Sequence, residues 1–194
     1  NKVDKHLLSL AILASRVATP NVTGGKLGTE LVDADANTNA TSLISTIFEA
    51  IQKLDENNVP TQGRVCIVAP DQYYQLANVD KLVNRDFSSD NGDFGKGTVL
   101  SIGGVPIVKS NTATEVFATD LSASISGTNN TYNGDFSNTH CVVMHSSAIG
   151  TVKLKDLVME STYDPRRLGT LMTARMALGH GILRPESAIS IKTS

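Results

Sequence analysis

The sequence predicts an α+β fold, and three features indicate it. Apolar residues repeat at helical spacing in residues 3–18 and again in residues 41–54. Short runs rich in β-branched residues, such as RVCIVA, follow in the middle of the chain. A strand-like alternation of apolar and charged residues, TVKLKDLVME, begins the tail at residue 151. The chain therefore contains both helices and strands, which is the α+β fold class.

The two helices near the N-terminus have clear ends. In residues 3–18 the apolar stripe includes Leu7, Leu10 and Ala14, and Pro20 stops the helix because the residue before a proline avoids helical geometry. A link rich in Gly, Asp and Asn continues to about Asn39. The second helix then runs over residues 41–54 and is closed by the sequence ENNVP.

The middle of the chain alternates strands with turns. Residues 64–69 predict a buried strand, and Pro70 with Asp71 predicts the start of a helix, where proline and an acidic residue are both favoured. Residues 98–110 predict two strands that meet at Gly103 and Gly104. The polar residues 122–139 predict an exposed surface loop without apolar anchors that tolerates insertion, and HCVVMH predicts another strand.

The tail changes character after residue 150. Val152 and Leu154 alternate with Lys153 and Lys155, which predicts a strand with the lysines on one face. The parity slips near Asp156, which predicts a β-bulge. Residues 168–183 are ambiguous between helix and strand by periodicity alone, although two glycines weigh against a helix.

Composition narrows the class of protein. The chain has 194 residues, of which 40% are hydrophobic and 19% charged, and its formal net charge is −2. No basic block occurs, which argues against a protein that holds nucleic acid by neutralising phosphates. The apolar stretches are too short to span a membrane, and no signal peptide is visible. The first residue is not Met, so we expect the chain to be part of a longer one.

The residue types that carry chemistry do not form a recognisable site. Cys66 and Cys141 lie in apolar runs and are predicted to be reduced, buried thiols with a passive structural role. His140 and His145 are five residues apart on one predicted strand and should point to opposite faces. We therefore predict no metal site.

Three short motifs fail for specific reasons. DADANTN begins like a calcium loop but lacks the glycine and the glutamate that such a loop needs, so a helix-capping linker is the better interpretation. GDFGKGT looks like a phosphate loop, but the residue five before Gly95 is Asp90 and Lys96 is followed by Gly97 instead of Ser or Thr, which favours a hairpin or a surface loop. Asp71 is a conceivable acid or base without a partner. We predict no catalytic residue and no cofactor.

The longest informative segments are MHSSAIGTVKLKDL and MALGHGILRPESA, together with NNVPTQGRVCIVAPDQYYQLA upstream. They closely resemble the major capsid protein of short-tailed double-stranded DNA phages, the podoviruses and autographiviruses of the T-odd coliphage and cyanophage type. The resemblance spans most of residues 42–191.

This resemblance implies the tailed-phage major capsid (HK-97-type) fold. Residues 1–39 would belong to the peripheral domain as its spine helix and linker, and residues 40–150 would form the axial domain. Residues 151–194 would return to the peripheral domain as a long β-ribbon, which makes residues 168–183 a strand. The N-terminal arm and the extended loop of the family are absent from this chain, as a truncation or as a part not observed.

The resemblance also implies a structural function. The protein would self-assemble through hexamers and pentamers into an icosahedral shell that encloses DNA without sequence-specific binding. Scaffolding protein, portal and other capsid components would be its partners, and no membrane would be involved. It would be assembled in the host cytoplasm and end in the virion capsid. Two alternatives remain open, an encapsulin-like shell protein and a small α/β enzyme that uses the VAPDQ turn.

The segment ARMALGHGILRPESAI raises a separate question about packing. On a strand, Gly179 and Gly181 leave one face bare while His180 points to the other. Either the chain's own helix at residues 3–18 packs on the bare face, or a neighbouring subunit does. Arg184-Pro185-Glu186 would end the strand and leave two charges free for a subunit boundary. The candidate subunit-packing residues are Gly179, Gly181, Arg184, Glu186, Lys153 and Lys155.

Overall fold

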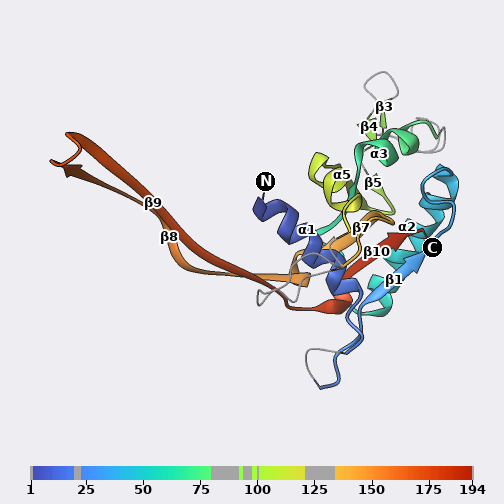
Figure 1. The fold of residues 1–194 in the computed structure, drawn as a ribbon. Helices are drawn as coiled ribbons and strands as arrows, with labels where there is room; N and C mark the ends of the chain where they lie inside the picture. The colour runs from blue at the N-terminus through green and yellow to red at the C-terminus, as the bar shows by residue number, and fades with distance from the viewer. Residues whose placement is uncertain are drawn as a thin grey trace.

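A six-stranded mixed sheet lies at the centre of the body of the molecule, in strand order β1-β10-β7-β2-β6-β5 (Figure 1). The computed structural model describes residues 2–19, 23–79, 92–93, 98–99, 101–120 and 134–193. Two neighbouring pairs, β1 with β10 and β2 with β6, are parallel, and the other pairs are antiparallel. The strands are β1 (Thr29–Val32), β2 (Arg64–Val68), β5 (Ser101–Ile102), β6 (Val105–Lys109), β7 (Thr139–His145) and β10 (Ala188–Lys192).

One face of this sheet is covered by α2 (Ala40–Glu56) and α3 (Pro70–Ala77). The buried stripe of α2 includes Leu43, Ile47 and Leu54, which pack in one cluster with inward residues of β2, β7 and β10. Because side chains alternate along a strand, these inward residues take every second position, such as Ile189 and Ile191. The helices predicted at residues 41–54 and from Pro70 are confirmed, as is the buried strand at residues 64–69.

The opposite face of the sheet is covered by α1 (Lys2–Ser15) and α5 (Asn111–Phe117). Leu8, Ile12 and Val142 meet there in a second cluster with the fully buried Phe136. The Ser15 and Ser190 hydroxyls are 2.6 Å apart and join α1 to the middle of β10. The first helix is thus confirmed, but it ends before the predicted boundary at residue 18.

Short polar contacts explain where α2 begins. Asn39 Oδ1 accepts hydrogen bonds from the backbone amides of Thr41 and Ser42, as a helix N-cap does. The Asp33 carboxylate accepts from the hydroxyls of Ser42 and Thr46 at 2.9 Å. The DADANTN segment therefore caps a helix, as predicted.

Gly103 and Gly104 form the turn between β5 and β6, with φ of +56° and +79°. Two consecutive residues in the left-handed region make the tight hairpin turn that glycine favours. The two strands predicted to meet at these glycines are confirmed. The GDFGKGT segment contributes to a second hairpin, in which β3 (Gly92–Asp93) pairs with β4 (Thr98–Val99).

The loop predicted over residues 122–139 falls largely outside the described residues. Its final part is described from residue 134 onward, and there Phe136 is fully buried under α1. Arg16 also lies over the Phe136 ring, with 5.7 Å between the guanidinium carbon and the ring centroid. The expectation that this segment has no apolar anchor is therefore wrong for its last residues.

The two cysteines lie on adjacent strands in the core between the sheet and α2. Both are fully buried free thiols, and their Sγ atoms are 3.2 Å apart. Hydrogen bonding to Cys66 and then burial raise the pKa of the Cys141 thiol. A raised pKa disfavours the reactive thiolate, which agrees with a passive structural role.

Among the described residues, no helix is long and apolar enough to cross a membrane.

Thr139 provides a test of polar burial in this core. Its hydroxyl is buried and has no hydrogen-bond partner among the described residues. We expect Thr139→Val to leave the free energy of unfolding unchanged or to raise it by up to about 1 kcal/mol, because valine keeps the shape and removes an unsatisfied group. Thr46→Val is the matched control and should cost about 1 kcal/mol, because its hydroxyl donates to Asp33. Urea unfolding of both variants measures the difference, and a larger loss for Thr139→Val would contradict this account.

Candidate assembly surface

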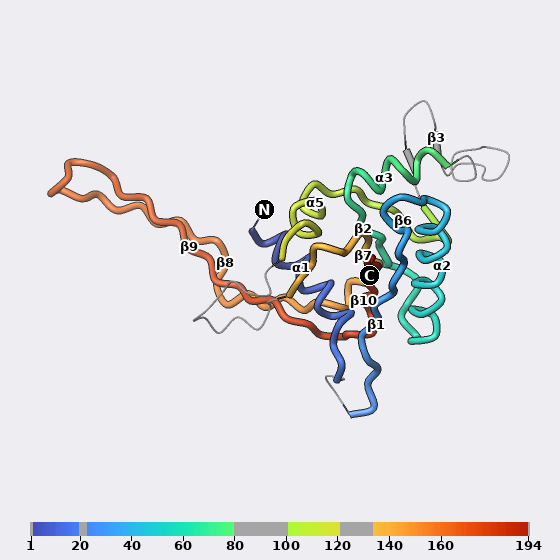
Figure 2. The backbone as a smooth tube through the Cα atoms, turned by 45° about the vertical axis from the view of Figure 1, so that its right-hand side comes forward, coloured from blue at the N-terminus to red at the C-terminus, as the bar shows by residue number. Residues whose placement is uncertain are grey.

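A long two-stranded ribbon projects from the body of the molecule (Figures 1 and 2). It consists of β8 (Ile149–Asp164) and β9 (Gly169–Ile182), which form an antiparallel pair and, among the described residues, pair with no other strand. Sixteen residues in extended conformation span about 50 Å. The ambiguous segment at residues 168–183 is thus a strand, as the resemblance implied.

The pairing of the ribbon shifts twice, between Lys153 and Lys155 and between Lys155 and Val158. The second shift confirms the bulge predicted near Asp156, whereas the first was not predicted. Lys153 lies opposite Leu178 and Lys155 opposite Ala177, which are consecutive on β9. The two lysines therefore lie on opposite faces, and the expectation that they share a face is wrong.

Exposed apolar side chains run along the whole ribbon. Leu154 is 88% exposed and Val152 is 73% exposed. The other large apolar side chains exposed there are Leu157, Val158, Met159, Tyr163, Leu168, Leu171, Met172 and Met176. A two-stranded ribbon is at best marginally stable alone in water, and extended exposed apolar surface marks sites of association. The ribbon is therefore the strongest candidate for an assembly surface.

Glycines leave one face of the ribbon bare where it joins the body. Gly150 pairs with Gly181, and Val152 pairs with Gly179, so these four residues share a face. A Cβ atom added at Gly179 or Gly181 would meet no heavy atom within 4 Å. The expectation that the chain's own first helix packs against this bare face is therefore wrong.

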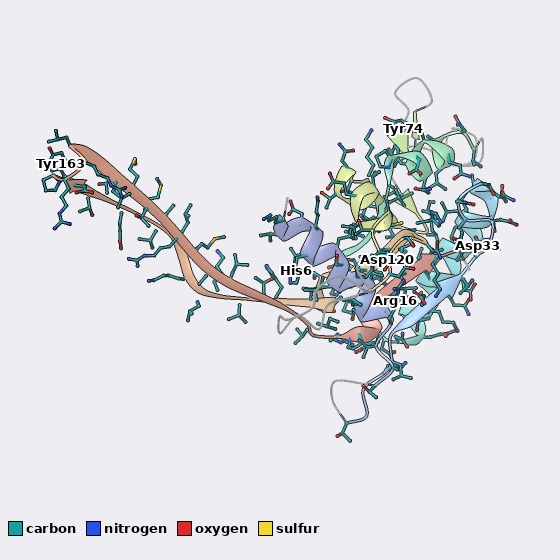
Figure 3. All side chains as sticks on the ribbon, in the orientation of Figure 1. His6, Arg16, Asp33, Tyr74, Asp120 and Tyr163 are labelled. Carbon is teal, nitrogen blue, oxygen red and sulfur yellow. The ribbon has the colours of Figure 1, made fainter. Side chains whose placement is uncertain are left out.

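His180 lies on the other face, and this face is the one that contacts α1. Its Nδ1 atom is 2.9 Å from the Thr151 hydroxyl across the ribbon. Its ring centroid is 5.7 Å from that of His6 on α1, which is labelled in Figure 3. The prediction that His180 and the glycines face opposite ways is confirmed. The contact with His6 was missed, because no local pattern relates residues so far apart in the sequence.

The His6 contact gives a prediction about acid stability. Burial, and then the nearby His180, lower the pKa of His6 from its usual value of 6.5. The unfolded chain therefore binds more protons than the folded one just below pH 6.5, and stability falls as the pH decreases through that range. We expect the melting temperature of His6→Gln, measured by circular dichroism, to fall less between about pH 7.5 and pH 5.5 than that of the wild type. This interval of about two pH units spans the usual pKa of histidine.

His140 acts in the same direction, because burial lowers its pKa although Asp71 raises it. The His6→Gln variant should therefore keep part of the acid sensitivity, and the variant with His140→Gln added should show the least. An equal loss in wild type and in His6→Gln would show that burial and the neighbouring His180 do not oppose protonation of His6.

The Arg184-Pro185-Glu186 segment follows β9 at the base of the ribbon, where the strand was predicted to end. Strand β9 stops at Ile182, and a short helical turn, η2 (Pro185–Ser187), leads into β10. Arg184 Nε donates to Glu186 Oε1 at 2.9 Å, and Pro185 is buried. The strand ends as predicted, but the two charges pair with each other and are not free.

The other side chains singled out in the sequence lie on the body of the molecule. Asp71 accepts a hydrogen bond from Gln72 Nε2 at 3.0 Å, and this neutral amide is not an acid or a base. These two residues line a pocket of about 190 Å³ with His140. His145 lies apart and bonds to Ser147, as expected for histidines on opposite faces. The described residues contain no group of three or more His, Cys, Asp and Glu side chains suited to a metal ion.

A larger pocket of about 530 Å³ lies between α1 and strands β2, β6 and β7 of the sheet, next to the base of the ribbon. Most of its lining is apolar, including Leu7, Ile67 and Met144, and Asp4 is the charged residue at its border. An apolar hollow beside a projecting apolar ribbon suits association between protein surfaces better than it suits acid–base catalysis.

Comparison with known proteins gives the family. A sequence profile of the Gp10A-like family, described as major capsid protein, matches residues 1–192. The chain belongs to this family. The major capsid protein of Enterobacteria phage T3 is 27% identical to this capsid chain over 167 residues, which is 77% of the chain and 46% of that relative. This capsid chain therefore spans about half the length of the curated relative.

Two solved phage structures resemble this capsid chain over nearly all of its length. The capsid structure of the cyanophage P-SCSP1u matches 100% of the chain and 62% of its own chain, with 32% identity and a TM-score of 0.87. The mature capsid of bacteriophage PhiM1 matches 99% of this chain and 60% of its own, with 24% identity and a TM-score of 0.80, and supports the fold. The resemblance to short-tailed phage capsid proteins and the tailed-phage capsid fold are both confirmed.

Proposed function

We propose that this chain builds the icosahedral shell that encloses the double-stranded DNA genome of a phage. Membership of the major capsid family is the observation that carries this proposal. The exposed apolar ribbon supports it, because extended exposed apolar surface marks a site of association. Many copies that cover one another's ribbons form a closed shell if the repeated contact closes on itself.

We propose that residues 40–150 form the axial domain around the symmetry axes of hexamers and pentamers. Residues 1–39 and 151–194 then form the peripheral domain. The ribbon projects away from the body, which agrees with a peripheral role for β8 and β9. The last strand, β10, pairs with β7 and β1 within the central sheet, so the segment at residues 151–194 contributes to the body as well as to the ribbon.

The subunit contact that we propose lies at the base of the ribbon. Gly179 and Gly181 leave backbone accessible, so a segment of a neighbouring copy can approach closely there. Lys153 and Lys155 add positive charge on both faces of the ribbon, and the Arg184–Glu186 pair lies where the ribbon meets the body. These six residues are the proposed contact positions.

The proposed partners are other copies of this chain, scaffolding protein, portal and other capsid components. Assembly takes place in the host cytoplasm, and the finished shell is part of the virion. The net charge of −2 and the lack of a basic block suit a shell that confines DNA without gripping it. The protein has a structural role and performs no catalysis.

Shortening the ribbon tests this proposal. In the full-length product, residues 154–177 are replaced by Asn-Gly, a two-residue hairpin turn between the paired residues Lys153 and Leu178. The body should keep its melting temperature, because these ribbon residues are exposed or half-buried and the sheet pairs without them. Sedimentation should find shells for the wild type and only small species for the shortened variant. Shells of normal size from the shortened variant would contradict an assembly role for the ribbon.

A further inference from the structure

Methionine is concentrated on the ribbon. The chain has four methionines, and Met159, Met172 and Met176 all lie exposed on β8 and β9. The fourth, Met144, lines the larger pocket of the body. Exposed methionine is uncommon on an ordinary soluble surface, because its unbranched thioether side chain is apolar. The position of these side chains therefore needs an explanation.

The strand register places the three methionines on one face. Met159 pairs with Ala174, and Ser161 pairs with Met172. Since alternate residues share a face, Met176 lies on the same face two positions beyond Ala174. Tyr163, labelled at the far end of the ribbon in Figure 3, pairs with Thr170 on this face as well. We call Met159, Tyr163, Met172, Ala174 and Met176 the methionine face.

The opposite face of the outer ribbon has a different character. All charged side chains between residues 158 and 164 and between residues 169 and 176 belong to it, namely Glu160, Asp164 and Arg175. Glu160 and Arg175 form an ion pair there. Its exposed apolar side chains are Val158 and Leu171. The outer ribbon is therefore amphipathic, and the methionine face is its uncharged side.

The charge of the ribbon indicates which molecule covers this face. Residues 149–182 contain five basic and three acidic residues, so the ribbon carries +2. The whole chain carries −2, so the remainder carries −4. A positively charged ribbon and a negatively charged body attract each other across two copies of the chain. The ribbon also projects away from its own body in both views (Figures 1 and 2).

We propose that the methionine face packs on the body of a second copy and that its methionines adapt one surface to neighbours that are not identical. This inference rests on the proposed shell function. In a shell of hexamers and pentamers, the same face meets its neighbour at slightly different angles. Methionine has three rotatable side-chain bonds and a polarisable sulfur, so it fills gaps of different shape at little cost. Branched side chains lack this freedom.

Oxidation measures whether the face is covered. Hydrogen peroxide converts exposed methionine to its sulfoxide, which peptide mass spectrometry quantifies. In assembled shells of the full-length product, Met159, Met172 and Met176 should react on the order of tenfold more slowly than in dissociated subunits. Free methionine added in equal amount to both samples serves as the reference for reagent strength. Equal rates for the three ribbon methionines in shells and in subunits would overturn the proposal.

Substitution separates apolar contact from adaptability. The triple variant M159Q/M172Q/M176Q should give folded subunits with the wild-type melting temperature and a shell yield reduced on the order of tenfold. The triple variant to isoleucine keeps the face apolar, so subunits should associate but form mostly irregular or unclosed particles. Thr173→Gln, which adds a glutamine on the opposite face without removing an exposed apolar side chain, is the control and should assemble as the wild type does.

The outcomes distinguish this inference from the shell function itself. Wild-type yield from the glutamine variant would overturn docking through this face, and uniform closed shells from the isoleucine variant would overturn adaptation by methionine. Either result with normal wild-type shells leaves the shell function intact. Failure of the wild-type full-length product to form shells would instead refute the function on which the inference rests.

Discussion

Replacing Gly28 with alanine should destabilise the subunit by about 3 kcal/mol, which is a large fraction of the stability of a typical domain. A Cβ atom at this position would overlap the backbone carbonyls of Ala14 and Ser15 at the end of α1. Backbone atoms cannot rotate away as a side chain can, so either α1 or the segment leading into β1 must move. The Gly28 amide also donates to the Val17 carbonyl at 3.1 Å, which fixes the close approach.

Urea unfolding of the purified subunit measures this effect. Gly24→Ala is the matched control, because Gly24 has φ of +80° and open space around its Cβ position. That variant carries backbone strain without a clash and should cost about 1 kcal/mol. A Gly28→Ala protein as stable as the wild type would show that α1 does not pack on this segment as described.

Valine at Gly179 or Gly181 should give a folded subunit that fails to form shells. A Cβ atom added at either position meets no heavy atom of its own chain within 4 Å, and β-branched residues suit a strand. If a neighbouring copy lies across the bare face, the added side chain holds it away and the contact is lost. We expect an unchanged melting temperature and a shell yield lower by at least about tenfold. The loss of about 1.4 kcal/mol at a single subunit contact already weakens association tenfold.

Sedimentation and thermal melting of the same preparations distinguish the outcomes. His180→Gln is the control at the residue between the two glycines. Glutamine keeps a polar group near Thr151, so this variant should assemble normally. Normal shells from both valine variants, or a complete block by His180→Gln, would remove the support for a contact at the glycine face. A misfolded valine subunit would indicate packing within the chain that the structure lacks.

Local patterns were sufficient for most of the fold. The helices near residues 41–54 and at Pro70 follow from apolar spacing and from the residues that cap them. The hairpin at Gly103 follows from the backbone conformation that its two glycines adopt easily. The slip in alternation near Asp156 predicted a real bulge. In each case the determining interactions lie within a few residues of one another.

Contacts between distant segments were not predictable in this way. Phe136 belongs to a polar stretch, yet it is buried because α1 covers it, and α1 lies more than one hundred residues earlier in the sequence. The meeting of His6 with His180 likewise depends on how the ribbon leaves the body. Lys153 and Lys155 were predicted to share a face because apolar and charged residues alternate regularly there. The bulge at Leu154 does not interrupt this alternation, so the sequence pattern does not reveal it. Periodicity reports local conformation but not which face is covered.

Electron microscopy of the purified full-length product tests the central claim most directly. The account predicts closed, uniform, icosahedral particles built from this protein, because its family is that of major capsid proteins and its ribbon exposes surface that other copies must cover. Reconstruction of such particles should find the ribbon of each subunit in contact with a neighbouring copy. A product that remains a soluble monomer under all assembly conditions, or whose ribbon stays uncovered in the particle, would contradict it.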